Sequence, residues 1–331
     1  LVGLLLPPKV IGLQLNSNHD GMGQYLYTNH GTDWEQLGCT GARQSPIDFP
    51  SGAPWGQFDT SDAVLPDGKF VHFSYSVSSA GEKVQFQNDG HSLAFNFAGK
   101  GYGGLHFNGG YYNLLSMNVH TLSEHTFKQH HFPAELHFVH KKSDADAILV
   151  VAVPVTTVAL PEGCLDEEDC KVSEEDETEA TDLAESLSGS PESPLPSTGH
   201  VVERDPFEVK PILEDGTFFE YSGSLTVPNC AENVVWLVKR EPLVLPAKVI
   251  GDIQNTIYSS NQGFGNFKTP SALADRNIFL RKASFDPVPA PADTEVPKRT
   301  RVITPLVRSL VVPFVRTNTI YFCIYLLFDS H

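Results

Sequence analysis

The sequence of 331 residues has little of several features that would assign it to a class of protein. It contains five cysteines and no CxxC pair, so we do not expect a zinc site made of thiolates. No apolar run reaches the ~20 residues that a transmembrane helix needs. Its 23 basic residues against 40 acidic residues give a net charge of -17, which argues against nucleic acid as a partner.

The acidity is concentrated in one segment. Residues 162–192 contain thirteen acidic residues and one lysine. Such a composition cannot bury enough apolar surface to order itself, and we expect a disordered insertion over residues 161–203. Cys164 and Cys170 lie inside it, and their spacing allows either a small disulfide loop or two free thiols.

Both ends of the chain differ in composition from its middle. We expect residues 1–24 to form a leader or a docking segment. Residues 284–331 predict a proline-rich linker followed by an apolar arm, which is too short and too charged to span a bilayer. We expect the arm to bind protein partners, with membrane association as the alternative, and Cys323 to be a partner-facing or a buried thiol.

The middle of the chain has the pattern of a β protein. Between residues 69 and 140 short segments alternate apolar and polar residues, with Gly, Asn and Asp between them, which is typical of antiparallel strands. Residues 146–155 are a continuous apolar run and predict a central strand. Sheet-like sequence returns over residues 218–245, and residues 246–259 predict a helix.

Two of these predicted strands place possible metal ligands in pairs. Residues two apart on a strand share a face, so Asn118 projects with His120, and Glu135 projects with His137. Three imidazoles and one open position make a catalytic zinc site, but the sequence offers Asn118 in place of one imidazole. We expect Glu135 to accept a hydrogen bond from His137 and to orient it.

Five motifs in order extend this observation to most of the chain. They are QSPIDF (44–49), NDGHS (88–92), HTLSEHT (120–126), PAELHFVH (133–140) and YSGSLTVPNCAENVVWLV (221–238). Together they resemble the α-class carbonic anhydrases over residues 25–283, the acidic segment being an insertion. The resemblance implies a mainly β fold, with a twisted, mostly antiparallel sheet of about ten strands and a few short helices.

The resemblance also implies a zinc site and identifies where this chain departs from it. The second and third zinc-binding histidines of the family match His120 and His137, whereas the first matches Asn118. Two residues before that position, where the family has a glutamine that orients the ligand, the chain has Ser116. We therefore expect zinc to bind weakly or not at all, because an amide oxygen is a weak donor for zinc.

Residues matched to the family's proton and water chemistry are present. Thr226 and Glu124 match the threonine that contacts the zinc-bound hydroxide and the glutamate that accepts the threonine's proton. His91 matches the proton-shuttle histidine. Tyr27 and Asn88 are identified with the water network between the metal and the shuttle.

Further matches concern packing. The apolar wall where carbon dioxide sits in the family corresponds to Val139, Ile148, Leu225 and Trp236. His125 and His140 match buried histidines with structural hydrogen bonds, and His130 and His131 are expected at the surface of a hairpin.

Cys39 and Cys230 match the disulfide of secreted family members. This pairing implies secretion or the lumen of an oxidising organelle, with a complex or a membrane surface as further options.

Two functions follow as expectations. The first is zinc-dependent, reversible hydration of carbon dioxide to bicarbonate, weakened or lost through Asn118. The second is a non-catalytic, carbonic-anhydrase-related subunit that serves as a structural or binding component of a larger assembly. Metal analysis and a hydration assay discriminate between them.

Overall fold

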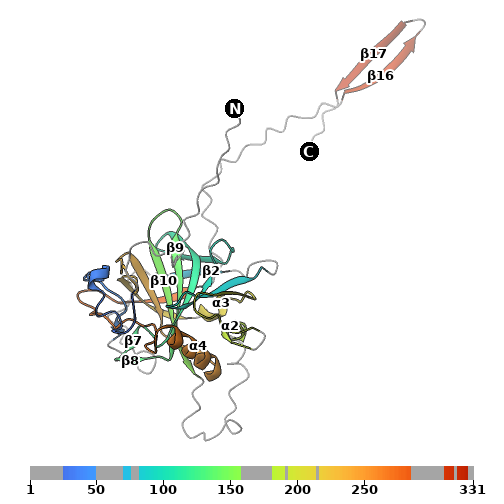
Figure 1. Ribbon diagram of the computed structural model, residues 1–331. Helices are drawn as coiled ribbons and strands as arrows, with labels where there is room; N and C mark the ends of the chain where they lie inside the picture. The colour runs from blue at the N-terminus through green and yellow to red at the C-terminus, as the bar shows by residue number, and fades with distance from the viewer. Residues whose placement is uncertain are drawn as a thin grey trace, which may run out of the picture. The chain divides into compact units, whose positions relative to one another are not determined.

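The computed structural model describes residues 25–49, 70–75, 82–157, 181–190, 193–213 and 216–284, together with two strands at 309–316 and 319–326. The chain divides into two compact units, Leu1–Pro287 and Val288–His331. The segments expected to be a leader and to hold Cys164 and Cys170 lie outside the described residues. Figure 1 shows the larger unit with its strands, and the separate pair β16 and β17.

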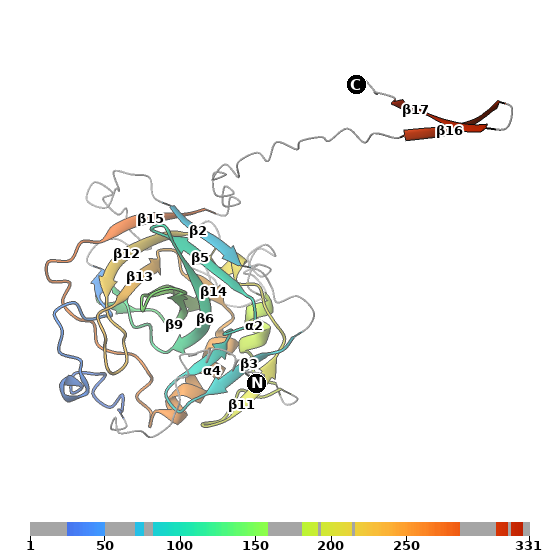
Figure 2. The ribbon, with the colours of Figure 1, turned by 90° about the horizontal axis from the view of Figure 1, so that it is seen from above.

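One large sheet dominates the first unit. It has twelve strands, in the order β11 (Val201–Arg204), β3 (Val84–Asn88), β4 (Leu93–Asn96), β6 (Gly110–His120), β5 (Gly103–Phe107), β2 (Phe70–Tyr75), β15 (Phe279–Ser284), β12 (Thr217–Gly223), β13 (Val234–Lys239), β10 (Ile148–Thr157) and β14 (Leu243–Leu245), with β9 (Ala134–Lys142) between β6 and β10. Because β9 pairs with both β6 and β10, the path through β5, β2, β15, β12 and β13 closes on itself. The curvature that this closure requires is seen in Figure 2.

Most strand pairs are antiparallel, as expected. Parallel pairing joins β10 to β13, β10 to β14, and β15 to β2. The continuous apolar run expected as a central strand is β10, whose first eight residues are all buried. The alternating segments form β3, β4, β6 and β9, and the buried apolar residues of one face, such as Phe86, Met117 and Phe138, belong to one large apolar cluster. The mainly β architecture predicted from the sequence is therefore confirmed, with twelve strands rather than about ten.

Helices are few and short. α4 (Ala247–Ser260) coincides with the predicted helix and buries Val249, Ile250, Ile253 and Ile257. α3 (Lys210–Leu213) and the 3-10 turn η1 (Glu35–Leu37) are shorter. Among the residues that the structure describes, no helix combines the length and apolarity needed to cross a membrane.

The second half of the expected disordered insertion is ordered. α2 (Thr181–Leu187) buries Leu183 and Leu187, which belong to the same apolar cluster as Ile253 of α4. Two leucines four residues apart lie on one helical face, and this local pattern is hidden by the acidic average of the segment. Residues 158–180 lie outside the described residues.

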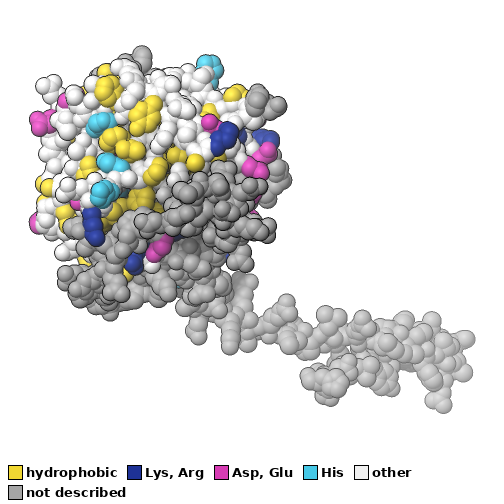
Figure 3. Space-filling view, turned by 90° about the horizontal axis from the view of Figure 1, so that it is seen from below, with side chains coloured by type: hydrophobic (Ala, Val, Ile, Leu, Met, Phe, Trp, Pro, Cys, Tyr) yellow, Lys and Arg dark blue, Asp and Glu magenta, His cyan; other side chains and the backbone are white. Residues whose placement is uncertain are grey.

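A small sheet made of β1 (Asp48–Phe49), β7 (Thr126–Phe127) and β8 (His130–His131) stands apart from the large one. Seen from below, the described surface carries histidine side chains among hydrophobic ones (Figure 3). In the second unit, β16 (Ser309–Arg316) and β17 (Thr319–Leu326) pair as an antiparallel hairpin.

Candidate metal centre

β6 and β9 bring the matched positions together by their register. Asn118 lies directly opposite His137, and His120 lies opposite Glu135. Residues directly opposite each other on antiparallel strands share a face, with Cβ atoms ~5 Å apart. Asn118, His120 and His137 therefore project from the same face of the sheet, as the spacing predicted.

His120 is held from a distant loop. Its Nδ1 lies 2.8 Å from the backbone oxygen of Asn266, and since a carbonyl oxygen only accepts, this nitrogen donates. The Nε2 of His120 is then the atom free to bind a metal. The ring is 5% exposed, so the hydrogen bond fixes both its orientation and its tautomer.

The side chain of Asn266 ties the same loop to the end of β6. Its Oδ1 accepts from the backbone N–H of Thr121 at 2.8 Å, and its Nδ2 donates to the oxygen of Val119 at 2.8 Å. The neighbouring Gly265 has φ of +69°, and a Cβ there would lie 2.3 Å from the oxygen of Thr121. Glycine is thus required where the loop crosses the strand.

His137 is held by its own strand. Its Nε2 lies 2.7 Å from the Oε1 of Glu135, which leaves Nδ1 for a metal. The carboxylate of Glu135 also accepts from His125, through Nδ1 at 2.6 Å and the backbone N–H at 2.9 Å. Burial raises the pKa of Glu135, but His125 and His137 outweigh it and hold that pKa well below its usual range.

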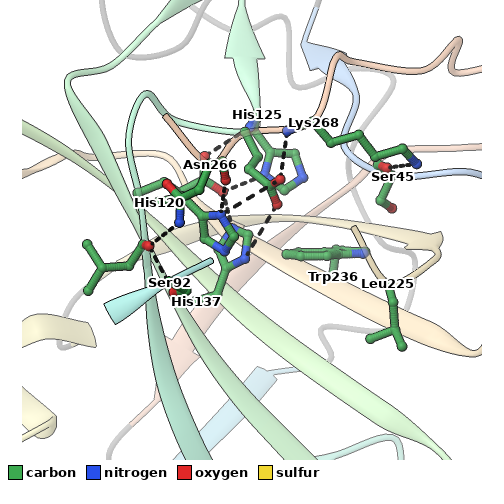
Figure 4. Close-up of polar contacts among 12 residues, drawn as sticks. Ser45, Ser92, His120, His125, His137, Leu225, Trp236, Asn266 and Lys268 are labelled. Carbon is green, nitrogen blue, oxygen red and sulfur yellow. Dashed lines mark hydrogen bonds and ion pairs between the residues drawn. The ribbon is translucent and has the colours of Figure 1, made fainter. Parts of the chain in front are cut away.

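The two candidate ligand rings lie next to each other. Their centroids are 4.3 Å apart, and that of His137 is 4.9 Å from the ring of Trp236. Figure 4 shows His120 and His137 side by side, with Trp236 beside them and Leu225 beyond. Burial, followed by the proximity of His120, lowers the pKa of His137, so the ring is neutral at pH 7 and able to bind a metal.

Two groups of residues have potential ligand atoms within 4.8 Å of one another. One is His120, Glu124 and His137, and the other is His125, Glu135 and His137. In the second group the histidine nitrogens facing Glu135 already donate to its carboxylate. The first group keeps free donor atoms, and it is the better candidate for a cation.

Asn118 adds a neutral oxygen on the same face of the sheet, opposite His137. As a whole Asn118 is half-buried, but its Oδ1 atom is buried and has no hydrogen-bond partner within the described chain. Ser116, two residues earlier, makes no side-chain hydrogen bond to the described residues that could orient Asn118. Two oriented imidazoles with unpaired oxygens beside them fit a divalent zinc ion.

Glu124 and Thr226 were predicted to act as a pair. Glu124 is fully buried, and its Oε1 accepts from the backbone N–H of Lys268 at 2.9 Å. Its Oε2 has no hydrogen-bond partner in the described chain. Thr226 is also buried, but no hydrogen bond joins its hydroxyl to Glu124 within the described residues. The two residues are present without the predicted link.

The residues matched to the apolar wall lie together. Ile148 and Trp236 belong to a second buried cluster, and Val139 and Leu225 pack against it. Trp236 donates its indole N–H to the oxygen of Ser224 at 3.0 Å, which fixes the ring. Of the four, Trp236 lies next to a candidate ligand, with its ring 4.9 Å from that of His137.

The predicted shuttle residue, His91, lies among aromatic rings. It stacks on Tyr25 at 4.1 Å, and the ring of Tyr27 is 6.3 Å away. Burial lowers the pKa of His91, and Asp89 partly opposes the shift. Its Nδ1 is buried without a partner in the described chain.

Asn88 is held by hydrogen bonds to three residues of the described chain. Its amide nitrogen donates to the oxygen of Pro196 at 3.1 Å and to the Oγ of Ser260 at 3.0 Å. Its Oδ1 accepts from the backbone N–H of Gly90 at 3.0 Å. These contacts occupy the side chain in joining the loop before His91 to α4, so they give no support to a role in the water network.

The remaining predictions concern cysteines and histidines. Cys39 and Cys230 form a disulfide, with Cα atoms 4.9 Å apart, which ties the loop after Thr226 to the N-terminal segment. His125 and His140 are buried and hydrogen-bonded, His125 to Tyr221 at 2.8 Å and His140 to Tyr75 at 2.6 Å. His130 is exposed, and His131 is half-buried, with its Nδ1 2.6 Å from the oxygen of Ser123.

Sequence reasoning missed three supporting residues. Asn266 orients His120, Lys268 donates its backbone N–H to Glu124, and Tyr25 stacks on His91. The side chain of Lys268 is also buried and bonded to Gln44 and Ser45; burial lowers its pKa to about 8, against the opposing effect of Glu124 and Glu232. The only signal in the sequence was the run of glycine and phenylalanine around Asn266, which marks a loop in close contact.

Comparison with known proteins agrees with this geometry. The family model for eukaryotic-type carbonic anhydrase matches residues 29–282. Carbonic anhydrase 4 of Oryctolagus cuniculus is 35% identical over 81 residues, covering 23% of this chain and 26% of the rabbit protein. Carbonic anhydrase 4 of Mus musculus is 25% identical over 198 residues, covering 56% and 57%. The matched segments thus span less than two thirds of these relatives.

Solved structures show the same fold. The α-carbonic anhydrase of Photobacterium profundum has a TM-score of 0.55 and 24% identity, covering 77% of this chain and all of that one. That of Thermovibrio ammonificans, in complex with the inhibitor sulfanilamide, has a TM-score of 0.54 at the same identity, covering 77% of this chain and 98% of its own. With the family model matching well over half of the sequence, the chain belongs to the α carbonic anhydrase family.

Proposed function

We propose that this protein binds zinc through His120 and His137, and that it hydrates carbon dioxide slowly compared with a site of three histidines. The observation that carries the proposal is the orientation of the two rings. The Nδ1 of His120 is bound to Asn266 and the Nε2 of His137 to Glu135, so the two remaining nitrogens are free for one cation.

The surrounding residues have the properties that this reaction needs. A zinc ion at such a site lowers the pKa of a bound water to about 7 and so supplies a nucleophile at neutral pH. Val139, Ile148, Leu225 and Trp236 offer an apolar surface that receives carbon dioxide and excludes bulk water. His91, with its pKa below the usual value, accepts the released proton and passes it to buffer.

Two features support a slow reaction. Asn118 replaces an imidazole with a neutral amide, which binds zinc less strongly. Thr226 makes no hydrogen bond to Glu124 in the described chain, so its hydroxyl lacks the acceptor that would orient it toward a nucleophile. Both features weaken the chemistry while leaving the fold and the two histidines intact.

The test combines metal analysis with kinetics on the purified protein. We expect one zinc per chain after dialysis against a micromolar zinc buffer, and hydration of carbon dioxide that is slow and sensitive to a sulfonamide. Replacing His91 with Ala should lower the rate in weak buffer, and added imidazole should restore it. A protein that retains no zinc under these conditions would contradict the proposal.

A second candidate is a non-catalytic binding subunit. It is favoured by Asn118 and by the hairpin β16–β17, an apolar segment whose strands pair with each other within a unit of their own. In that case the protein should bind a partner equally well after His120 and His137 are both replaced by Ala. Removal of residues 288–331 should abolish partner binding without changing zinc content.

The location proposed for either function is an oxidising compartment, either the secretory pathway with the cell exterior or the lumen of an organelle. The disulfide between Cys39 and Cys230 supports this proposal, because such bonds persist where thiols are not kept reduced.

A further inference from the structure

The Oε2 atom of Glu124 is a buried oxygen with a hydrogen-bonding capacity that the described chain does not use. The residue is 0% exposed, and only its Oε1 is bound, by the backbone N–H of Lys268 at 2.9 Å. Leaving a carboxylate oxygen buried without a partner is unfavourable, and more so when the group is charged. Such an atom points to a ligand that binds there.

The unused oxygen faces the free nitrogen of one candidate ligand. The Oε2 of Glu124 lies 3.8 Å from the Nδ1 of His137, the nitrogen that Glu135 does not occupy. Zinc bonds of about 2.0–2.2 Å in tetrahedral geometry separate two ligand atoms by roughly 3.4 Å. A movement of a few tenths of an ångström would bring both atoms onto one ion.

His120 completes the same group. Potential ligand atoms of His120, Glu124 and His137 all lie within 4.8 Å of one another. The His120 nitrogen that lies 3.8 Å from the Oε1 of Glu124 is the Nδ1 that donates to Asn266, so binding through Nε2 requires Glu124 to move toward that side of the ring. Asn118 projects from the same face of the sheet, opposite His137, and has its own unpaired Oδ1. The two oxygens therefore compete for one role, and a carboxylate is the stronger donor for zinc because it carries a charge.

We propose that Glu124 is itself a ligand, so that the metal centre of this chain consists of His120, His137 and Glu124. Two histidines and one glutamate are an established donor set for zinc. The structure is consistent with this role because Thr226, the predicted partner of Glu124, makes no hydrogen bond to it in the described residues. The inference rests on the proposed zinc binding and names the residue that replaces the missing histidine.

The test measures zinc affinity by competition with a chromophoric chelator, using the full chain. Glu124→Gln keeps the shape of the side chain and the oxygen that accepts from Lys268, but it removes the charge. Loss of a residue that only supports a ligand lowers metal affinity by about 10- to 100-fold, so we expect the loss of a ligand to lower zinc affinity by at least that much. Asn118→Ala should lower affinity much less. Glu232→Gln, which changes a carboxylate bonded to Arg43 and Gln44 instead, is the matched control and should change nothing.

A double-mutant cycle separates ligation from general damage. Asn118→His supplies a third imidazole, which should release Glu124, so that Glu124→Gln in that background costs little affinity. Cobalt(II) absorption reports the same change without any activity, because its visible bands depend on the donor set. Glu124→Gln should alter the cobalt spectrum of the wild-type chain but not that of Asn118→His.

The outcomes are distinct. If the wild-type chain binds zinc and Glu124→Gln leaves its affinity and cobalt spectrum unchanged, the role of Glu124 is wrong and zinc binding stands. If the wild-type chain binds no zinc, both proposals fail. Unfolding in urea without metal checks that Glu124→Gln folds, and we expect it to be at least as stable as the wild type, since a buried charge is removed.

Discussion

β6 and β9 carry candidate ligands on adjacent strands, but their support differs. On β9, His137 donates its ring N–H to Glu135, two residues earlier on the same strand. On β6, Asn118 has Ser116 at the equivalent position, and its Oδ1 has no partner in the described chain. The comparison indicates that binding a metal requires hydrogen-bond acceptors that orient the ligand side chains, in addition to the ligands themselves.

Removing the support of β9 should have the largest effect. Glu135→Gln takes one charge from a buried group in which Glu135 accepts from His125 and His137. Hydrogen bonds to a charged group contribute ~1.5–3 kcal/mol each, and we expect a loss of about 2–3 kcal/mol in the free energy of unfolding without metal. Urea denaturation measures it. Glu232→Gln, near the surface beside Arg43, is the control and should lower the free energy of unfolding by less than about 1 kcal/mol. Equal losses in the two variants would show that the buried hydrogen bonds of Glu135 do not stabilise the fold more than a surface contact does.

Restoring the ligand of β6 should have the next largest effect. Asn118→His places an imidazole opposite His137, and we expect zinc affinity to rise by about 10- to 100-fold and the rate of carbon dioxide hydration to rise with it. Chelator competition and stopped-flow hydration measure the two quantities. A variant with unchanged affinity would mean that the backbone of β6 places this side chain away from the ion.

The sequence predicted those parts of the fold and site that depend on neighbouring residues. Alternation predicted β6 and β9, the apolar run predicted β10, and the two-residue spacing placed Asn118 and His120 on one face of their strand. The contact between His120 and Asn266 joins residues 146 apart, and a loop of that kind has no periodicity that reveals it.

The expectation of disorder over residues 161–203 was wrong for its second half, because it relied on average composition and not on the pattern of neighbouring residues. For α2, composition averaged over many residues hid Leu183 and Leu187, whose spacing alone would have predicted a buried helical face. The pairing of Thr226 with Glu124 came from resemblance and stays a prediction, because whether the two side chains meet depends on how the loop after β12 packs, which no local pattern specifies.

The second buried histidine of β9, His140, gives a test of how the stability of the protein depends on pH. Burial lowers the pKa of His140 to about 3 from an ordinary value of 6.5. Between these values the unfolded chain binds a proton that the folded chain does not, so stability falls as the pH falls from about 6.5 toward 3. From pH 7 to pH 5 this contributes about 2 kcal/mol.

Urea midpoints at pH 7 and pH 5 measure this dependence. The difference between the two pH values should be smaller for His140→Gln, which can still accept from Tyr75, than for the wild type. His130→Gln, at an exposed position on β8, should keep the wild-type difference. The same dependence in both variants would assign the loss of stability to other groups.

We expect the smallest effect from adding a residue that orients the new ligand on β6. Ser116→Gln in the Asn118→His background places an amide two residues before the new imidazole, where β9 has Glu135 before His137. A neutral amide forms a weaker hydrogen bond than a carboxylate, so we expect a further gain in zinc affinity of about tenfold or less. Ser116→Gln alone should change affinity little, because Asn118 gives it no ring to orient. A gain from Ser116→Gln alone as large as in the double variant would mean that the new amide acts on the metal directly, and that support and ligation cannot be separated on this strand.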